Sequence, residues 1–418
     1  MAGLQCRRRL WLETHRRELA RVTPASEHIF RMGHLFGECA RPLMGQGDLI
    51  GHVQDVARAT EETREALRQA SDHGAMVYEA AFSHRNVVAR ADGFAPYTNG
   101  WHMTEVKASS NVKDYFYQDC AIQAWVAEGA GYPVRKVTLA CIDSRFVYPG
   151  GGAYEGLLQR IDVTAEVGRR KAAVDGIVND LRTVLSRDEP QIATGVHCSS
   201  PYACPFMAHC GGHSADTSRV SCRSAHHVSV SSPAMLAYPK HFLRFEAIAS
   251  PVPLWAGTRP YQRIPVQWSC QTETQRGTLI HRAFLDAFDA SSKHQFAHTL
   301  IDALQPSSAV IVATPAERAG LNALCESVPE RRVELRGLMR RLVHPASAAR
   351  TAHDVAGAVK SGEVTDSESA RRAWWEAASS ATDKEHRHRL ADDLLCYGRY
   401  QTLALHEAFG AHGVWPIA

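Results

Sequence analysis

A stretch poor in large apolar side chains divides this 418-residue chain and restricts how it can fold. Residues 211–234 read GGHSADTSRVSCRSAHHVSVSSPA, a run rich in Ser, His and Gly that is typical of a linker. The length also exceeds that of one ordinary domain. We therefore predict two domains, residues 1–212 and 237–418, joined by a linker over residues 213–236.

The composition is that of a globular protein rather than a disordered one, with 45% hydrophobic and 22% charged residues. No apolar run approaches the roughly 18–20 residues of a membrane helix, and the N-terminus carries arginines where a signal peptide needs apolar residues. We expect a cytoplasmic location and no membrane partner. In that reducing compartment the eleven cysteines would be metal ligands or buried thiols. A net charge of +3 does not by itself indicate nucleic-acid binding.

The first half alternates between helix and strand patterns, which predicts an α/β fold. Helical spacing covers residues 27–44, 53–70, 113–128 and 165–186. Strand patterns cover residues 75–82, 86–94 and 101–109. The segment APYTNG between the last two strands carries Pro and Asn-Gly turn signals, so these strands should form a hairpin.

Three charged residues on this hairpin form the main candidate site. Side chains of a strand alternate between its faces, so Glu105 and Lys107 project together, and Asp92 near the end of the preceding strand can come alongside Glu105. Two converging carboxylates can hold a divalent cation, and a nearby lysine can orient or deprotonate a water and offset phosphate charge. The tripeptide is common, and taken alone it favours surface residues of an edge strand by a wide margin.

The wider pattern resembles the RecB-like branch of the PD-(D/E)XK nucleases: Asp92, twelve intervening residues, Glu105-Val106-Lys107, and then a helix that carries Gln123. The resemblance implies a restriction-endonuclease-like core that hydrolyses phosphodiester bonds of DNA. It implies Mg²⁺ or Mn²⁺ held by Asp92, Glu105 and the backbone carbonyl of Val106. Lys107 and Gln123 would complete the catalytic set.

The helix over 113–128 presents Phe116, Asp119 and Gln123 on one face, at positions i, i+3 and i+7. By the resemblance Gln123 helps to fix the site; otherwise it is a solvent-facing amide. The Tyr that usually follows this glutamine in the family is absent, because Trp125 and Val126 stand there.

Relatives in that family also present a ligand from the first helix, at a position that falls on Gly37 here. His34 and Glu38 are nearby substitutes, although a pair at i and i+4 is more often a surface pair. Glu79, in the strand over 75–82, is a further acidic candidate.

Cys198, Cys204 and Cys210 recur at intervals of six in a segment rich in Pro and Gly, which can wrap a metal centre. The spacing resembles that of the iron–sulfur branch of the family, the CRISPR-associated RecB-like exonucleases, in which a cysteine near the N-terminus supplies the fourth ligand. Cys6 would be that ligand of a [4Fe–4S] cluster, which would act as a structural staple. A zinc site that uses His197 or His209 is the alternative.

The second half resembles the RNase H-like exonuclease domain of an uncharacterised bacterial two-domain family. YPKHFLRFEA matches its first motif and RPYQRIPVQWS matches the stretch that follows. Arg244 stands where the family has its first aspartate, and only Glu246 remains of that motif. Glu317 is retained, but four other family positions have changed, to Ala313, Thr314, Glu334 and Gln401. Because two-metal chemistry needs a cage of carboxylates, we expect this domain to be inactive.

The sequence thus predicts a metal-dependent deoxyribonuclease that acts on single strands or DNA ends, and the resemblance implies an exonuclease. CRISPR adaptation, repair or phage defence would supply its protein partners. A scaffold that binds DNA or a partner without useful turnover is the alternative.

Overall fold

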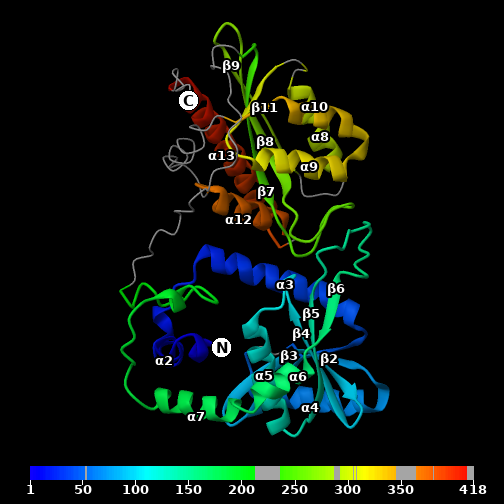
Figure 1. Cartoon of the computed structure of the whole chain (residues 1–418), viewed down its shortest axis with the longest axis vertical. Helices are drawn as coiled ribbons and strands as arrows, with labels where there is room; N and C mark the ends of the chain where they lie inside the picture. Colours follow the sequence, from blue (N-terminus) through cyan, green and yellow to red (C-terminus); the bar gives the residue numbers. More distant parts are fainter. Residues whose placement is uncertain are drawn as a thin grey trace. The chain divides into compact units, whose positions relative to one another are not determined.

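The computed structural model describes residues 1–51, 54–211, 236–286, 292–304, 306, 308–344, 364–379 and 381–411 (Figure 1). The chain forms two compact units, residues 1–146 with 154–221 and residues 147–153 with 222–418. Each unit contains one β-sheet with helices packed against it, so the fold is mixed α/β, as predicted. The predicted linker lies outside the described residues, except for residue 236.

The sheet of the first unit has six strands in the order β1-β2-β3-β4-β5-β6. Their bounds are Gly47–Leu49, Met76–His84, Val87–Tyr97, Gly100–Lys107, Val134–Ile142 and Leu158–Asp162. β1 and β2 are parallel, as are β4 and β5, and the other neighbours are antiparallel.

The predicted hairpin is the pair β3–β4. It closes between Tyr97 and Gly100, and Asn99 adopts a φ of 57°, a left-handed conformation that asparagine tolerates better than most residues. β5 is parallel to β4, which requires a crossover, and helix α5 (Asp114–Gly129) supplies it.

The remaining helices of the first unit are α1 (Ala2–Gln5), α2 (Arg7–His15), α3 (Pro24–Met44), α4 (Val56–His73), α6 (Thr164–Lys171) and α7 (Val174–Leu185), with short 3-10 turns η1 (Arg17–Leu19) and η2 (Val196–Cys198). The single helix predicted over 165–186 is wrong, because the chain breaks between α6 and α7. The break allows Val167, Val174 and Val178 to be buried in the same core. Apolar side chains of α4 and α5 join that core.

The sheet of the second unit has five strands in the order β11-β10-β7-β8-β9. Their bounds in chain order are β7 Lys240–Ile248, β8 Ile264–Glu273, β9 Leu279–Leu285, β10 Val310–Val312 and β11 Leu342–Val343. β7, β8 and β9 are antiparallel neighbours, whereas β10 is parallel to both β7 and β11.

Helices cover both faces of β7 in this unit. They are α8 (Ser292–Ala303), α9 (Ala316–Ser327), α10 (Arg332–Arg340), α12 (Ser367–Ala378) and α13 (Lys384–Ala411), with the 3-10 turn η4 (Pro329–Arg331). Leu243 and Phe245 pack with α8, α9 and α10, and Phe242 packs with α13. Because side chains alternate along a strand, Arg244 and Glu246 share the face of Phe242.

None of the helices in the described part of the chain combines the length and the apolarity needed to cross a membrane.

Candidate functional site

The hairpin and α5 bring Asp92, Glu105, Lys107 and Gln123 to one place. Asp92 Oδ2 accepts a hydrogen bond of 2.6 Å from the backbone N–H of Val106. Lys107 Nζ donates to Glu105 Oε1 at 2.7 Å. Gln123 is buried on α5, close enough to Glu105 for hydrogen bonding to favour the ionised carboxylate. The alternation of side chains on β4 places Glu105 and Lys107 on one face, as the sequence indicated, while β3 contributes Asp92 and α5 contributes Gln123.

Asp119 belongs to this group, although the sequence analysis assigned it no role. Its Oδ2 accepts a second bond from Lys107 Nζ, also of 2.7 Å, so the ammonium group lies between two carboxylates. Burial lowers the pKa of Lys107, but the two carboxylates of Glu105 and Asp119 raise it by more. The pKa of Lys107 is therefore above its usual value. The two carboxylates therefore favour the protonated form of Lys107.

The acidic residues at the centre of the site are poorly neutralised. Burial raises the pKa of Glu105, which is 5% exposed, and Lys107 opposes that rise. Burial raises the pKa of Asp92 well above its usual value, and the charge of Glu105 adds to the rise. Glu105 Oε2 is buried and has no hydrogen-bond partner among the described residues.

A divalent cation fits this arrangement, because it would supply the positive charge that Asp92 and Glu105 lack and a partner for the unsatisfied oxygen of Glu105. Carboxylate oxygens are the hard ligands that Mg²⁺ and Mn²⁺ prefer. The carbonyl of Val106 stays a predicted ligand. Within the described ranges, no group of three or more His, Cys, Asp or Glu side chains already surrounds one ion position.

Glu79 lies beside this centre. The β2–β3 register pairs Tyr78 with Gly93 and Ala80 with Ala91, which leaves Glu79 opposite Asp92. Glu79 has a φ of 57°, a conformation that costs a non-glycine residue about 1–3 kcal/mol. Its charge also contributes to the raised pKa of Asp92. Glu79 Oε2 also lies 3.5 Å from Arg90 Nε, and the role of Glu79 as an additional ligand stays a prediction.

His34 and Glu38 are exposed on α3. In the part of the chain that the structure describes, no reported hydrogen bond or ion pair joins either residue to Asp92, Glu105 or Lys107. Their role as ligands stays a prediction.

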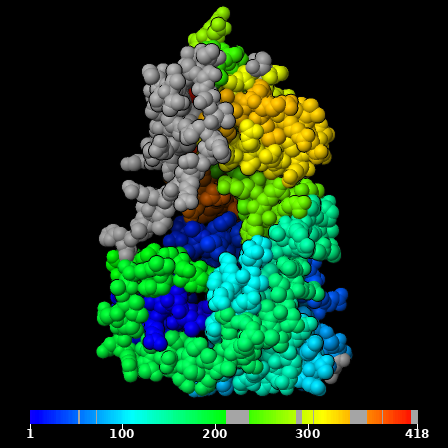
Figure 2. Space-filling model, in the orientation of Figure 1, coloured from blue at the N-terminus to red at the C-terminus, as the bar shows by residue number. Residues whose placement is uncertain are grey.

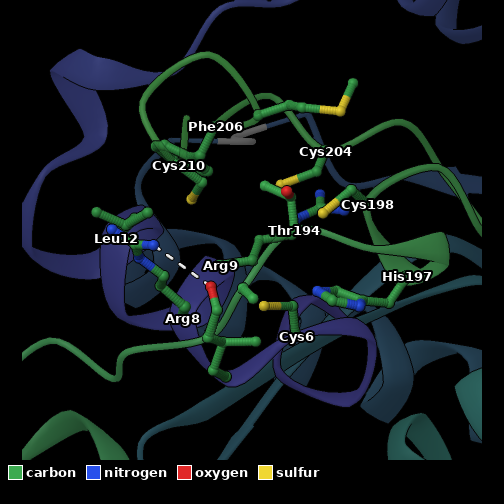
Figure 3. Close-up of a pocket in the computed structure, with 13 residues that line it drawn as sticks. Cys6, Arg8, Arg9, Leu12, Thr194, His197, Cys198, Cys204, Phe206 and Cys210 are labelled. Carbon is green, nitrogen blue, oxygen red and sulfur yellow. Dashed lines mark hydrogen bonds between the residues drawn. The ribbon is translucent and has the colours of Figure 1, made fainter. Parts of the chain in front are cut away.

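The four predicted cluster cysteines line one pocket, and Figure 3 shows their sulfur atoms facing its interior. Cys6 immediately precedes α2 as its N-cap residue, whereas the other three come from the segment 198–210. Burial raises the pKa of Cys204 and Cys210, and the neighbouring thiols contribute to the rise. Four convergent sulfur ligands suit an iron–sulfur cluster or zinc.

The two histidines of the zinc alternative differ in position. His197 lines the cysteine pocket, and its backbone carbonyl accepts a hydrogen bond of 2.7 Å from Gln5 Nε2. His209 Nε2 lies 3.6 Å from Glu189 Oε1. Of the two, His197 is therefore the more favourable nitrogen ligand for zinc.

The first helices also bind the end of the unit through ordinary contacts. Arg8 Nε donates to Glu189 Oε1 at 2.6 Å, and Trp11 Nε1 donates to the carbonyl of Arg187 at 2.8 Å. Gln5 Nε2 donates to the carbonyl of Tyr202 at 2.6 Å. The two ends of the first unit therefore meet through protein contacts, to which metal–thiolate bonds would add.

In the second unit, Arg244 contacts Gln401 and the buried Glu317. Arg244 Nη1 donates to Glu317 Oε1 at 2.9 Å, and Arg244 Nε donates to Gln401 Oε1 at 3.2 Å. Glu317 Oε2 accepts from the hydroxyl of Thr314 at 2.8 Å, and its side chain is 1% exposed. The guanidinium group therefore supplies a positive charge at this acidic position.

Glu246 lies one step further along β7. Burial raises its pKa and Arg244 opposes the rise, while the hydroxyl of Ser367 donates to Glu246 Oε1 at 3.2 Å. Glu334 is elsewhere, on α10, where its carboxylate pairs with Arg331 at 3.2 Å. The contacts of Arg244 and the position of Glu334 are consistent with an inactive domain.

Comparison with known proteins adds one finding. Residues 241–360 match a family described as "Domain of unknown function (DUF2779)". The matched segment begins within β7 of the second unit. That description names no activity or ligand. No curated protein matches the chain.

The acidic centre predicts an unusual response to neutralisation. A carboxyl group whose pKa is raised by folding destabilises the protein as pH rises through that raised pKa. Asp92→Asn should therefore raise the thermal midpoint of metal-free protein, and the difference should grow as pH rises above the usual pKa of an aspartate. Each 1 kcal/mol of difference in the free energy of unfolding would shift the thermal midpoint by roughly 2–4 °C. An equal or lower midpoint for the variant at every pH would contradict this view of the site.

The ion pair of the second unit predicts the opposite response. Arg244→Ala leaves Glu317 buried without its cation, which should cost about 3–5 kcal/mol in the free energy of unfolding. The matched control is Arg318→Ala, which removes an exposed arginine from α9, the helix that carries Glu317. It should change the free energy of unfolding by less than about 0.5 kcal/mol. Chemical denaturation of the full chain measures both. Equal effects of the two substitutions would show that Arg244 has no such role.

Proposed function

We propose that the first unit is a Mg²⁺- or Mn²⁺-dependent deoxyribonuclease of the RecB-like PD-(D/E)XK type. The observation that carries this proposal is the buried group at the end of β4, where Glu105 holds an unsatisfied carboxylate oxygen next to Asp92 and the ammonium group of Lys107. In an ion pair with a purely structural role, each buried polar atom would have a partner. Here one carboxylate oxygen of Glu105 has none, and a bound cation would supply it.

The residues divide the chemistry among them. Asp92 and Glu105 would hold the metal, which polarises a phosphoryl oxygen and lowers the pKa of its bound water. Lys107, kept protonated by its two carboxylate neighbours, would place positive charge beside the scissile phosphate. Gln123 would keep Glu105 in position, as groups behind metal ligands commonly do.

The cysteine pocket belongs to the same proposal as a structural [4Fe–4S] site held by Cys6, Cys198, Cys204 and Cys210, with zinc as the alternative. The convergence of four sulfur atoms from two distant segments supports it.

For the second unit we propose a degenerate RNase H-like domain. Its strand order supports that fold: three antiparallel strands, β7 to β9, are followed by β10 and β11, which extend the sheet in parallel from the other edge of β7. The pairing of Arg244 with Glu317 supports loss of metal chemistry there.

That pairing also favours a second function for the whole chain, a scaffold that binds single-stranded DNA, DNA ends or a protein of CRISPR adaptation or phage defence. Under this alternative the first unit would bind DNA but turn it over poorly. Cleavage assays decide between the two.

Digestion of end-labelled single- and double-stranded DNA by the full chain tests the nuclease proposal. Cleavage should require Mg²⁺ or Mn²⁺, and Asp92→Ala or Glu105→Ala should reduce its rate by at least about 100-fold, because each removes a metal ligand. Gln123→Ala should reduce it by about 10- to 100-fold. The matched control is Glu128→Ala, on the same helix but paired with Lys171, which should retain wild-type cleavage.

Wild-type rates in both ligand variants would place the activity elsewhere. Tight DNA binding by the wild type without any cleavage would favour the scaffold.

The cysteine pocket is tested separately by metal analysis of protein purified without oxygen. We expect iron, inorganic sulfide and visible absorption, and Cys204→Ser should remove all three and lower the thermal midpoint. Cys39→Ser, which changes a partly buried thiol outside the pocket, should retain them. Colourless wild-type protein containing zinc would establish the alternative metal.

A further inference from the structure

Two aromatic side chains lie next to the proposed nuclease site without being part of it. Tyr115 belongs to the first turn of α5, and Tyr202 belongs to the segment between Cys198 and Cys204. Their ring centroids are 5.2 Å apart, and their planes meet at 71°. In this edge-to-face geometry each ring leaves at least one broad face uncovered by the other. Tyr202 is 40% exposed, so part of its side chain is accessible to a ligand.

The position of Tyr202 is fixed by its backbone. Its carbonyl accepts the hydrogen bond from Gln5 Nε2, and the segment that carries it is closed by a bond of 2.8 Å from Cys204 N–H to the carbonyl of Cys198. A ring held in this way loses little conformational entropy when a ligand stacks on it.

Contacts between rings and cations connect the pair to the site. Tyr115 packs on Phe116 with centroids 4.7 Å apart, and Lys107 Nζ lies 5.4 Å from the centre of the Phe116 ring. The tyrosine pair is therefore one aromatic ring away from the ammonium group that would meet the scissile phosphate.

A second cation lies beside the pair. Lys113 is exposed, and its Nζ is 5.9 Å from the ring centres of both Tyr115 and Phe116. An exposed ammonium group next to an aromatic surface is the combination that single-strand binding sites use, because bases stack on the rings while cations meet the backbone.

We propose that Tyr202 and Tyr115 form a stacking site for an unpaired nucleobase, with Lys113 on an adjacent phosphate and the strand leading to Lys107. The inference rests on the proposed nuclease function and deepens it, since it names the substrate as a single strand or an unpaired end. Bases inside a duplex have both faces covered by their neighbours, and only an unpaired base can offer a face to a tyrosine.

The test measures binding rather than cleavage, so it does not depend on turnover. The full chain is titrated in a chelator with a fluorescent oligothymidine. Tyr202→Ala should weaken binding by about 5- to 150-fold, the range expected for loss of one base–aromatic stack. Tyr202→Phe keeps the ring without the hydroxyl and should stay within about twofold of the wild type. Tyr97→Ala removes a tyrosine of similar exposure, 46%, from the far end of β3 and is the matched control.

A second measurement guards against general damage by the substitution. An oligonucleotide that carries 2-aminopurine should lose fluorescence on binding the wild type and Tyr202→Phe, because stacking quenches that base. Tyr202→Leu, which retains apolar bulk, should fold with the same circular dichroism and fail to quench. Equal binding and quenching by Tyr202→Leu and the wild type would overturn the stacking site.

The outcomes also separate this inference from the function on which it rests. Stacking without cleavage would support the site and reject the nuclease. Cleavage with normal binding by Tyr202→Ala would support the nuclease and overturn the stacking site. Failure of the wild type to bind single strands would reject the stacking site, and failure to cleave both single- and double-stranded DNA would reject the nuclease.

Discussion

The ammonium group of Lys107, held between Glu105 and Asp119, is the interaction on which the organisation of the first unit depends. It joins the end of β4 to the first half of α5, and α5 is also the crossover that places β5 parallel to β4. The same contact fixes the charge of Lys107, because two carboxylate neighbours favour the protonated form. One ion triad thus contributes to the fold and defines the electrostatics of the proposed site.

The two units treat buried acidic residues in different ways. In the first unit, Glu105 keeps a buried oxygen without a hydrogen-bond partner among the described residues, and the pKa of Asp92 is well above its usual value. In the second unit, Glu317 is satisfied by Arg244 and Thr314. In the first unit a bound cation would be the partner of the unsatisfied Glu105 oxygen, whereas in the second unit Arg244 is already the cation beside Glu317. This difference is the physical basis for proposing metal chemistry in one unit and a binding or structural role in the other.

The cysteine segment serves more than one element of the first unit. Its thiols face a shared pocket with Cys6, and the carbonyl of Tyr202 is bound by Gln5 from the same N-terminal region. The segment thereby places the Tyr202 ring against Tyr115 of α5. A metal bound by the thiols would stiffen this segment, so the proposed cluster and the proposed stacking site are mechanically connected.

The sequence by itself determined the local features of this protein. Period-two alternation on the β3–β4 hairpin put Glu105 and Lys107 on one face, and helical spacing put Gln123 on the side of α5 that is buried. The equal cysteine spacing and the arginine at position 244 were also visible in the sequence. The placement of Glu105, Lys107 and Gln123 could be predicted because side-chain direction within one element follows from backbone geometry alone.

Only the tertiary structure decided which elements meet. Asp119 became a partner of Lys107, Glu79 came opposite Asp92, and Tyr202 reached Tyr115 across 87 positions of the chain. The helix predicted over 165–186 broke in two for the same kind of reason, since burial of Val167 and Val174 in one core required a change of direction. Contacts between distant segments depend on how whole elements pack, and a local pattern carries no record of that packing.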